Sequence, residues 1–274
     1  MTRFRIDPAL RQGIAELGSH RVALSVLLLS AVVLAVAEYL LIPTRFPGLF
    51  PDLVRRVAPG VWYGSAERAL SAGETGTWWG PLAPFAWWTL GLSLVWVVVP
   101  FLWARRHGFR ARDLGWRWRG LRSRLWLYGL LFLPVLIAVG WAATRPAFLE
   151  TYPLLRPEQL THWSWSVLGI YWLLYLLQFV CLEAFFRGFL LFTLERHIGA
   201  SAIGVMVVPY CMIHFHKPLP EVFGAIIAGL VLGWLALATR SLLGGVLLHI
   251  SVALAMDIAA LAQNPLGFPT RWLV

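Results

Sequence analysis

The chain is dominated by apolar stretches, and all but one of them, residues 200–214, are long enough to cross a lipid bilayer. Seven of them follow one another, at residues 22–43, 82–104, 125–143, 163–194, 200–214, 222–239 and 242–262. A helix needs about 20 apolar residues to cross the hydrocarbon core. Within that core a single segment can satisfy its own backbone hydrogen bonds only as a helix. The pattern therefore predicts an all-α, polytopic transmembrane helical bundle of about seven spans.

Composition excludes other classes of protein. Of the 274 residues, 59% are hydrophobic and 13% are charged, whereas a soluble domain carries about 25% charged residues. The net charge is +10, and Lys217 is the only lysine. Because the arginines lie between apolar stretches, we expect the lipid bilayer as partner and no nucleic acid. Cys181 and Cys211 lie in apolar surroundings and form neither a disulfide framework nor a zinc knuckle.

The distribution of arginine predicts the orientation. Residues 105–124 hold eight arginines and one aspartate, which marks this loop as cytoplasmic by the positive-inside rule, although it could also bind anionic lipid headgroups. Counting spans puts the N-terminus, residues 195–200 and Arg240 on the same side. Residues 1–20 lack the features of a cleaved signal peptide. We expect an integral protein of a bacterial inner (cell) membrane.

A few charged residues interrupt the spans, at a cost of a few kcal/mol each on insertion scales. Glu183 and Arg187 are four residues apart and share one helix face, so that Arg187 can neutralise Glu183. A structural ion pair is the simpler interpretation. Glu38 lies near the end of the first span, where it can reach the membrane interface.

Three polar residues from different spans lie at similar depths. At about 1.5 Å of rise per residue, Glu183 is roughly 18 Å, His214 roughly 21 Å and His249 roughly 14 Å from the cytoplasmic ends of their segments. Each histidine alone could be a hydrogen-bonded core residue. Their agreement in depth predicts instead a shared polar cavity within the membrane.

One carboxylate and two imidazoles suit hydrolysis. Glu183 with a histidine can draw a proton from water, and a second histidine can stabilise an oxyanion. The same groups, Glu183, His214 and His249, could instead hold zinc. Alternative metal ligands are His216, Glu221 and Asp257. Pro209 predicts a kinked short helix before His214.

At these residues the chain resembles the CPBP family of intramembrane proteases, which includes type II CAAX prenyl endopeptidases and bacterial immunity relatives. The family pattern is Glu-Glu-x-x-x-Arg, Phe-x-x-x-His and His-x-x-x-Asn or Asp. Residues 182–187 read LEAFFR, residues 210–214 read YCMIH and residues 249–253 read HISVA. The chain therefore departs from the family at Leu182, at Tyr210 and at Ala253. The resemblance covers about residues 163–262.

The resemblance implies an N-terminal transmembrane region at 1–160 with three spans and the basic loop, and a catalytic core at 161–274. It implies an endopeptidase that cleaves a membrane-associated protein or peptide. Glu183 with His214 would activate water, Arg187 would orient Glu183, and His249 would stabilise the oxyanion or join a metal site. Zinc and no metal both remain open, and Asp257 or Glu221 could supply the missing carboxylate.

Two other functions stay open. Because Leu182 and Ala253 replace polar family residues, the chain could be a catalytically silent relative that acts as a membrane immunity or scaffold protein. Glu183, His214 and Asp257 could also form the proton relay of a transporter. Against a transporter, the sequence has no repeated halves.

Overall fold

A computed structural model describes residues 20–43, 49, 80–160 and 162–272, and in this part every predicted span is helical. The main helices are α2 (Arg21–Val36), α5 (Ala83–Leu92), α6 (Val99–Arg106), α7 (Leu125–Ala142), α8 (Pro146–Thr151), α9 (Trp165–Glu183), α10 (Phe192–Ile198), α11 (Ala202–Met212), α12 (Leu219–Thr239) and α13 (Leu243–Gln263). Wider π-helical turns extend three of them, at η1 (Ala37–Leu41), η4 (Ser93–Val98) and η8 (Ala184–Leu191). Short 3₁₀ turns complete the chain at η3 (Gly80–Leu82), η5 (Ala111–Leu114), η6 (Arg122–Arg124), η7 (Pro157–Gln159) and η9 (Gly199–Ser201).

Six helices in the described residues are long and apolar enough to cross a membrane. The prediction of about seven spans is confirmed in this sense, because the fourth and fifth stretches form one run, Trp165–Met212. Within that run the chain turns at Gly199, whose φ of 59° suits a residue without a side chain. The final helix of the run, α11, has 11 residues with Pro209 inside. It is therefore too short to cross a bilayer alone, as its sequence predicts.

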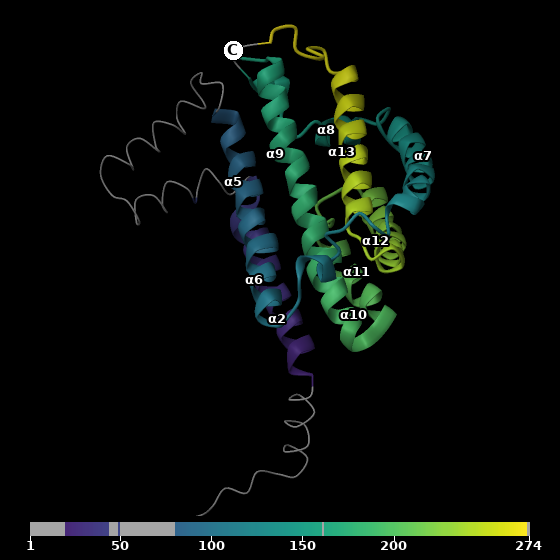
Figure 1. Ribbon diagram of the computed structural model, residues 1–274. Coiled ribbons are helices and arrows are strands. Elements are labelled where there is room, and N and C mark those ends of the chain that lie inside the picture. Colours follow the sequence, from purple (N-terminus) through teal and green to yellow (C-terminus); the bar gives the residue numbers. More distant parts are fainter. Residues whose placement is uncertain (1–19, 44–48, 50–79, 161, 273–274) are drawn as a thin grey trace, which may run out of the picture.

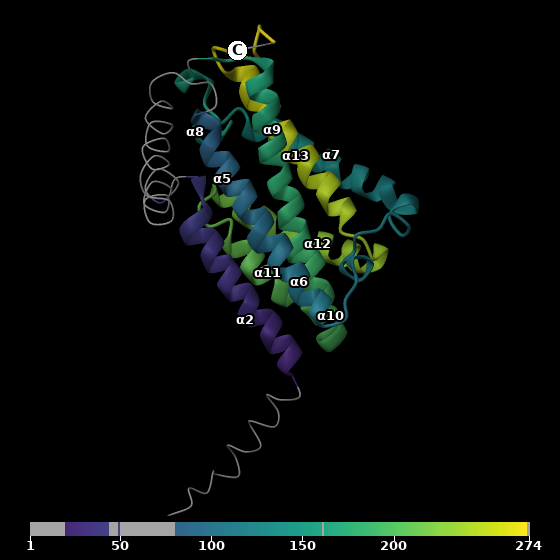
Figure 2. The same cartoon turned by 60° about the vertical axis from the view of Figure 1, so that its left-hand side comes forward.

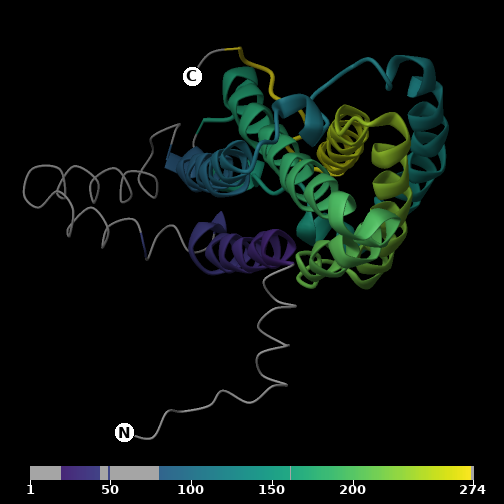
Figure 3. The ribbon, with the colours of Figure 1, turned by 60° about the horizontal axis from the view of Figure 1, so that its bottom comes forward.

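Helix α9 lies at the centre of the bundle. It packs against α5 on one side and α13 on the other (Figure 1). Turning the molecule shows α13 between α9 and α7 (Figure 2). Seen from the α10 end, α2 and α5 lie on one side of α9, and α7 lies on the other side beyond α13 (Figure 3). Residues carried by α9 and α13 therefore meet in the interior.

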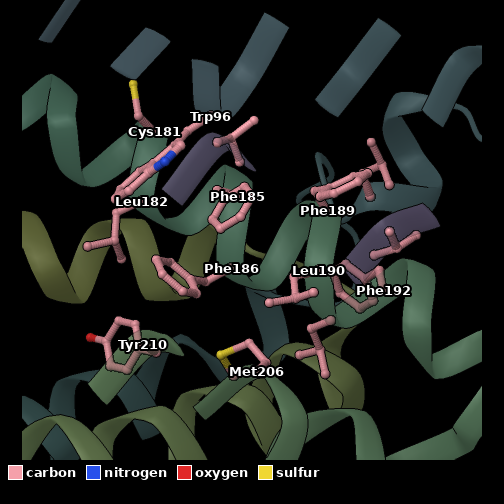
Figure 4. Close-up of a cluster of buried hydrophobic side chains, with 14 of the residues drawn as sticks. Trp96, Cys181, Leu182, Phe185, Phe186, Phe189, Leu190, Phe192, Met206 and Tyr210 are labelled. Carbon is pink, nitrogen blue, oxygen red and sulfur yellow. The ribbon is translucent and has the colours of Figure 1, made fainter. Parts of the chain in front are cut away.

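The largest apolar cluster surrounds η8. Figure 4 shows its aromatic centre, with Trp96, Phe185, Phe186 and Phe189 packed between the helices. Tyr210 lies at its edge, with its ring in the cluster and its hydroxyl pointing away from Met206. The apolar cluster therefore ends at Tyr210, whose hydroxyl is the polar group at its edge.

Polar contacts tie three connecting segments together at one end of the bundle. Arg117 Nε donates to the Arg240 carbonyl oxygen at 2.7 Å, and Arg240 forms an ion pair of 2.9 Å with Glu195. These contacts join the arginine-rich loop to the ends of α10 and α12. The sequence predicts that the three segments share one side of the membrane. That this side is cytoplasmic stays a prediction, and residues 1–19 lie outside the described residues.

Gly244 of α13 allows α7 to approach closely, and this generates a prediction. A Cβ atom at Gly244 would lie 2.2 Å from the Tyr128 ring. We expect Gly244→Ala to destabilise the fold by about 1–3 kcal/mol, as overpacking does, measured by thermal unfolding in detergent. Gly140→Ala in α7 is the control, because a Cβ there meets nothing within 4 Å. Equal stability of the two variants would contradict the packing of α7 on α13.

Candidate active site

Glu183 ends α9, and the π-helical turn η8 starts at the next residue. π-Helical turns are rare and are frequently found at functional sites. The Glu183 side chain has 0% exposure, and so does the side chain of Arg187 within η8. Arg187 Nη1 donates a hydrogen bond of 2.8 Å to Glu183 Oε1. The predicted pair therefore forms, and it neutralises a carboxylate that would be costly to bury alone.

Helix α13 brings His249 to the same carboxylate. Its Nδ1 lies 2.8 Å from Glu183 Oε1, and its ring stacks on Phe179 of α9 with centroids 5.9 Å apart. One helical turn earlier, Gly245 makes room for the carboxylate, because a Cβ there would lie 2.3 Å from Glu183 Oε2. The contact between Glu183 and His249 therefore depends on the absence of a side chain at residue 245.

Tyr210 of α11 completes this group. Its hydroxyl lies 2.9 Å from His249 Nε2, and its ring lies under the Arg187 guanidinium, 4.2 Å from Cζ to the ring centroid. Glu183, Arg187, Tyr210 and His249 thus form a closed ring of contacts, named here the Glu183 cluster. A cation over an aromatic face is stabilised further when water is absent, which suits a guanidinium with two unpaired nitrogens.

His214 lies in the turn just beyond α11. Its Nδ1 is 2.8 Å from the Tyr210 carbonyl oxygen. Because a carbonyl oxygen only accepts, this Nδ1 carries the hydrogen and Nε2 keeps its lone pair. Burial lowers the pKa of His214 below its ordinary value, so the ring is neutral at pH 7.

The predicted meeting of His214 with the other two residues is indirect. In the described part of the chain no hydrogen bond or ion pair joins His214 to Glu183. The two are linked through Tyr210, whose ring centroid lies 5.0 Å from that of His214 and whose hydroxyl contacts His249. The sequence marks Tyr210 only as a departure from the phenylalanine of the family pattern and assigns it no role. A hydroxyl at an otherwise apolar motif position was the signal that could have identified it.

The alternative ligands lie elsewhere. His216 is 77% exposed and contacts Glu38 at 3.0 Å. Glu221 accepts a hydrogen bond from the Tyr152 hydroxyl. Asp257 has two donors of its own, which are the Tyr171 hydroxyl at 3.3 Å and Trp172 Nε1 at 3.0 Å. These side chains have partners outside the Glu183 cluster. Among the described residues, they do not form the relay from Glu183 to Asp257 that a transporter would need.

Lys217 also has a partner away from the Glu183 cluster. Its Nζ donates to the Tyr152 hydroxyl at 3.1 Å, and burial lowers the pKa of this ammonium group. Because Tyr152 also bonds Glu221, the three side chains tie the turn after His214 to the segment that follows α8.

The placement of these residues does not fit a metal ion. Among the described residues, no three His, Cys, Asp or Glu side chains gather closely enough to hold one. Both ring nitrogens of His249 already face partners, Glu183 and Tyr210. A zinc ligand needs a free lone pair directed at the metal, and Tyr210 occupies the remaining one.

The two departures from the family pattern lie in apolar surroundings. Leu182 is buried in the large cluster beside Trp96 (Figure 4). Ala253 is buried among Tyr171, Tyr175 and their neighbours. In the described residues, no polar side chain from elsewhere takes the place of the missing polar group at either position.

The comparisons with known proteins point to the same region. Residues 163–255 match the family described as "Type II CAAX prenyl endopeptidase Rce1-like". This range holds α9 to most of α13 and thus the whole Glu183 cluster and His214. This segment, which is about a third of the chain, is therefore similar to a family of CAAX-protease-like membrane proteins, as its motifs predict. No curated protein and no solved structure matches the chain.

The buried ion pair generates a second prediction. Arg187→Met leaves the Glu183 carboxylate without its cation, and we expect a loss of about 3–5 kcal/mol in stability. Adding Glu183→Gln removes the uncompensated charge and should recover most of that loss. Thermal unfolding in detergent measures both variants.

Arg196→Met is the control, because its ion pair with Asp113 is long, at 3.6 Å, and largely solvated. Such pairs contribute about 0–1 kcal/mol. If Arg187→Met were no less stable than Arg196→Met, the Glu183 charge would not be compensated by Arg187.

Proposed function

We propose that this protein is an intramembrane endopeptidase that hydrolyses a peptide bond in a membrane-associated protein or peptide. The observation that carries the proposal is the 2.8 Å contact between Glu183 and His249. These residues are far apart in the sequence, come from α9 and α13, and meet inside the segment that matches a peptidase family. Buried acid–base groups of this kind concentrate at functional sites.

His214 is the residue best suited to accept the proton of the attacking water. It is neutral, and its Nε2 lone pair has no hydrogen bond among the described residues. Water attacks the scissile carbonyl carbon and its proton passes to Nε2. The same proton then goes to the leaving amine nitrogen as the carbon–nitrogen bond breaks. The products are a carboxylic acid and an amine, which become a carboxylate and an ammonium group when the acid's proton passes to the amine, so that no further reactant is needed.

The Glu183 cluster supports this step. Arg187 fixes the position of the Glu183 carboxylate, and the carboxylate contacts the His249 ring. With 16% of its side chain exposed, His249 is more accessible than Glu183. It is therefore the member of the cluster that can approach the substrate. Because the residues lie among spans, the substrate is a chain that enters from the bilayer.

A catalytically silent relative is the second candidate. The apolar burial of Leu182 and Ala253 favours it, since these positions are polar in the family pattern. Such a protein would bind a membrane partner as an immunity or scaffold protein. Substitutions that remove acid–base groups but keep the fold separate the two functions.

A peptidase needs His214, and this can be tested against its exposed neighbour. We expect His214→Ala and Glu183→Gln to lose at least about a hundredfold in rate, the contribution expected of a general acid–base group. His216→Ala should keep the wild-type rate, because its side chain is largely exposed and contacts Glu38. The assay uses purified protein in bicelles with a pool of synthetic transmembrane peptides, and mass spectrometry identifies the products.

Normal unfolding temperatures are required of each variant. If the wild type cleaves no peptide, or if His214→Ala cleaves as fast as His216→Ala, the peptidase mechanism is wrong. Preserved biological function in Glu183→Gln and His214→Ala cells would then support the silent relative.

The lowered pKa of His214 predicts the pH profile. The base is active only when neutral, so kcat/KM should fall as the pH decreases through this pKa. Because burial lowers the pKa, the midpoint should lie below the ordinary value of about 6.5, and the rate should be nearly constant between pH 7 and 8. A midpoint above pH 7, measured with a peptide from the pool, would exclude His214 as this base.

A further inference from the structure

Tyr210 is the polar group of the site that no part of the proposed reaction uses. It is 1% exposed, and its two ends contact the two charged or ionisable partners of Glu183. The ring lies under Arg187, and the hydroxyl lies 2.9 Å from His249 Nε2. A buried tyrosine hydroxyl usually has a hydrogen-bond partner. The contact is therefore informative only when its donor and its acceptor are known.

The direction follows from the other face of the imidazole. Nδ1 of His249 faces the Glu183 carboxylate at 2.8 Å, and an ionised carboxylate only accepts hydrogen bonds. An imidazole with one hydrogen therefore carries it on Nδ1 here, and Nε2 holds the lone pair. Tyr210 must then donate its hydroxyl hydrogen to Nε2. Tautomers are assigned from such partners, and here the carboxylate decides, because the Tyr210 hydroxyl can either donate or accept.

We propose that Tyr210 is a positioning residue of the site, which fixes the ring orientation and the tautomer of His249 through this donated hydrogen bond. The inference rests on the proposed peptidase function for its catalytic consequence. The approach of Nδ1 to Oε1 is close but lacks the direction of a good hydrogen bond, so Glu183 alone does not fix the ring. The Tyr210 hydroxyl supplies the second, directional point of attachment.

The contact between Tyr210 and His249 matters because two polar residues of the family pattern are replaced in this chain. Leu182 and Ala253 offer no polar atom from their side chains, and Asp257 is engaged by Tyr171 and Trp172. Tyr210 is therefore the described side chain that holds Nε2 of His249. Its carbonyl oxygen also accepts from His214 Nδ1, so a single residue of α11 orients both histidines.

Tyr210→Phe tests the inference, because it removes one oxygen and keeps the ring under Arg187. The matched control is Tyr171→Phe, which also removes a buried tyrosine hydroxyl with a partner, Asp257, outside the Glu183 cluster. The first readout is ¹⁵N NMR of histidine-labelled full-length protein in detergent, with the His249 signals assigned by their loss in His249→Ala. The second is kcat and KM on a peptide from the pool.

In the wild type we expect His249 signals of a single Nδ1–H tautomer with Nε2 accepting a hydrogen bond. Tyr210→Phe should shift the Nε2 resonance and introduce the second tautomer. Its kcat should fall two- to tenfold, the value of one hydrogen bond, with KM little changed. Tyr171→Phe should leave the His249 signals and kcat unchanged.

Unchanged His249 signals in Tyr210→Phe would overturn the inference, and so would a kcat equal to that of the wild type. A wild type that cleaves no peptide but shows the expected tautomer would overturn the proposed peptidase function, and with it the catalytic role of Tyr210, while the hydrogen bond itself would stand. The NMR readout does not depend on activity, so the two failures are distinguishable.

Discussion

The burial of the Glu183 charge is the constraint on which the centre of this structure depends. A carboxylate with no exposed surface inside a membrane protein needs a compensating cation and hydrogen-bond donors. Arg187 supplies the cation from the next turn, and the wider π-helical turn between them accompanies this arrangement. The Arg187 guanidinium also lies over the Tyr210 ring. Four helical segments, α9, η8, α11 and α13, are thus linked through one carboxylate.

Close helix packing makes this linkage possible. Helix α13 reaches Glu183 only because Gly245 presents no side chain, and it reaches α7 only because Gly244 leaves room for Tyr128. Two adjacent glycines therefore face two different neighbours of the same helix. Small residues commonly permit such close approach between membrane helices. Here they also determine where an acid and a base can meet.

The polar residues of this site belong to one family pattern, but they differ in burial and in hydrogen bonding. Glu183, which is fully buried, contacts one nitrogen of His249, whereas His214 keeps a ring nitrogen without a hydrogen bond among the described residues. Tyr210 stands between the two histidines and replaces an apolar family residue. The loss of polar side chains at 182 and 253 and the gain of a hydroxyl at 210 belong to one site. A peptidase that tolerates these departures must rely on the hydrogen-bonded histidines rather than on a second glutamate.

Sequence alone determined the helical membrane class, the positions of the spans and the candidate residues for the site. Apolar length and charge placement determine these features without knowledge of packing. It also predicted that Glu183 pairs with Arg187, because residues four apart share a helix face. Counting residues along each span put Glu183, His214 and His249 at a similar depth, but it did not show which of them are in direct contact. Only the tertiary structure decided that His249 meets Glu183 while His214 is reached through Tyr210. Rotation of each helix about its axis depends on packing at residues such as Gly245, and spacing along one chain does not specify that rotation.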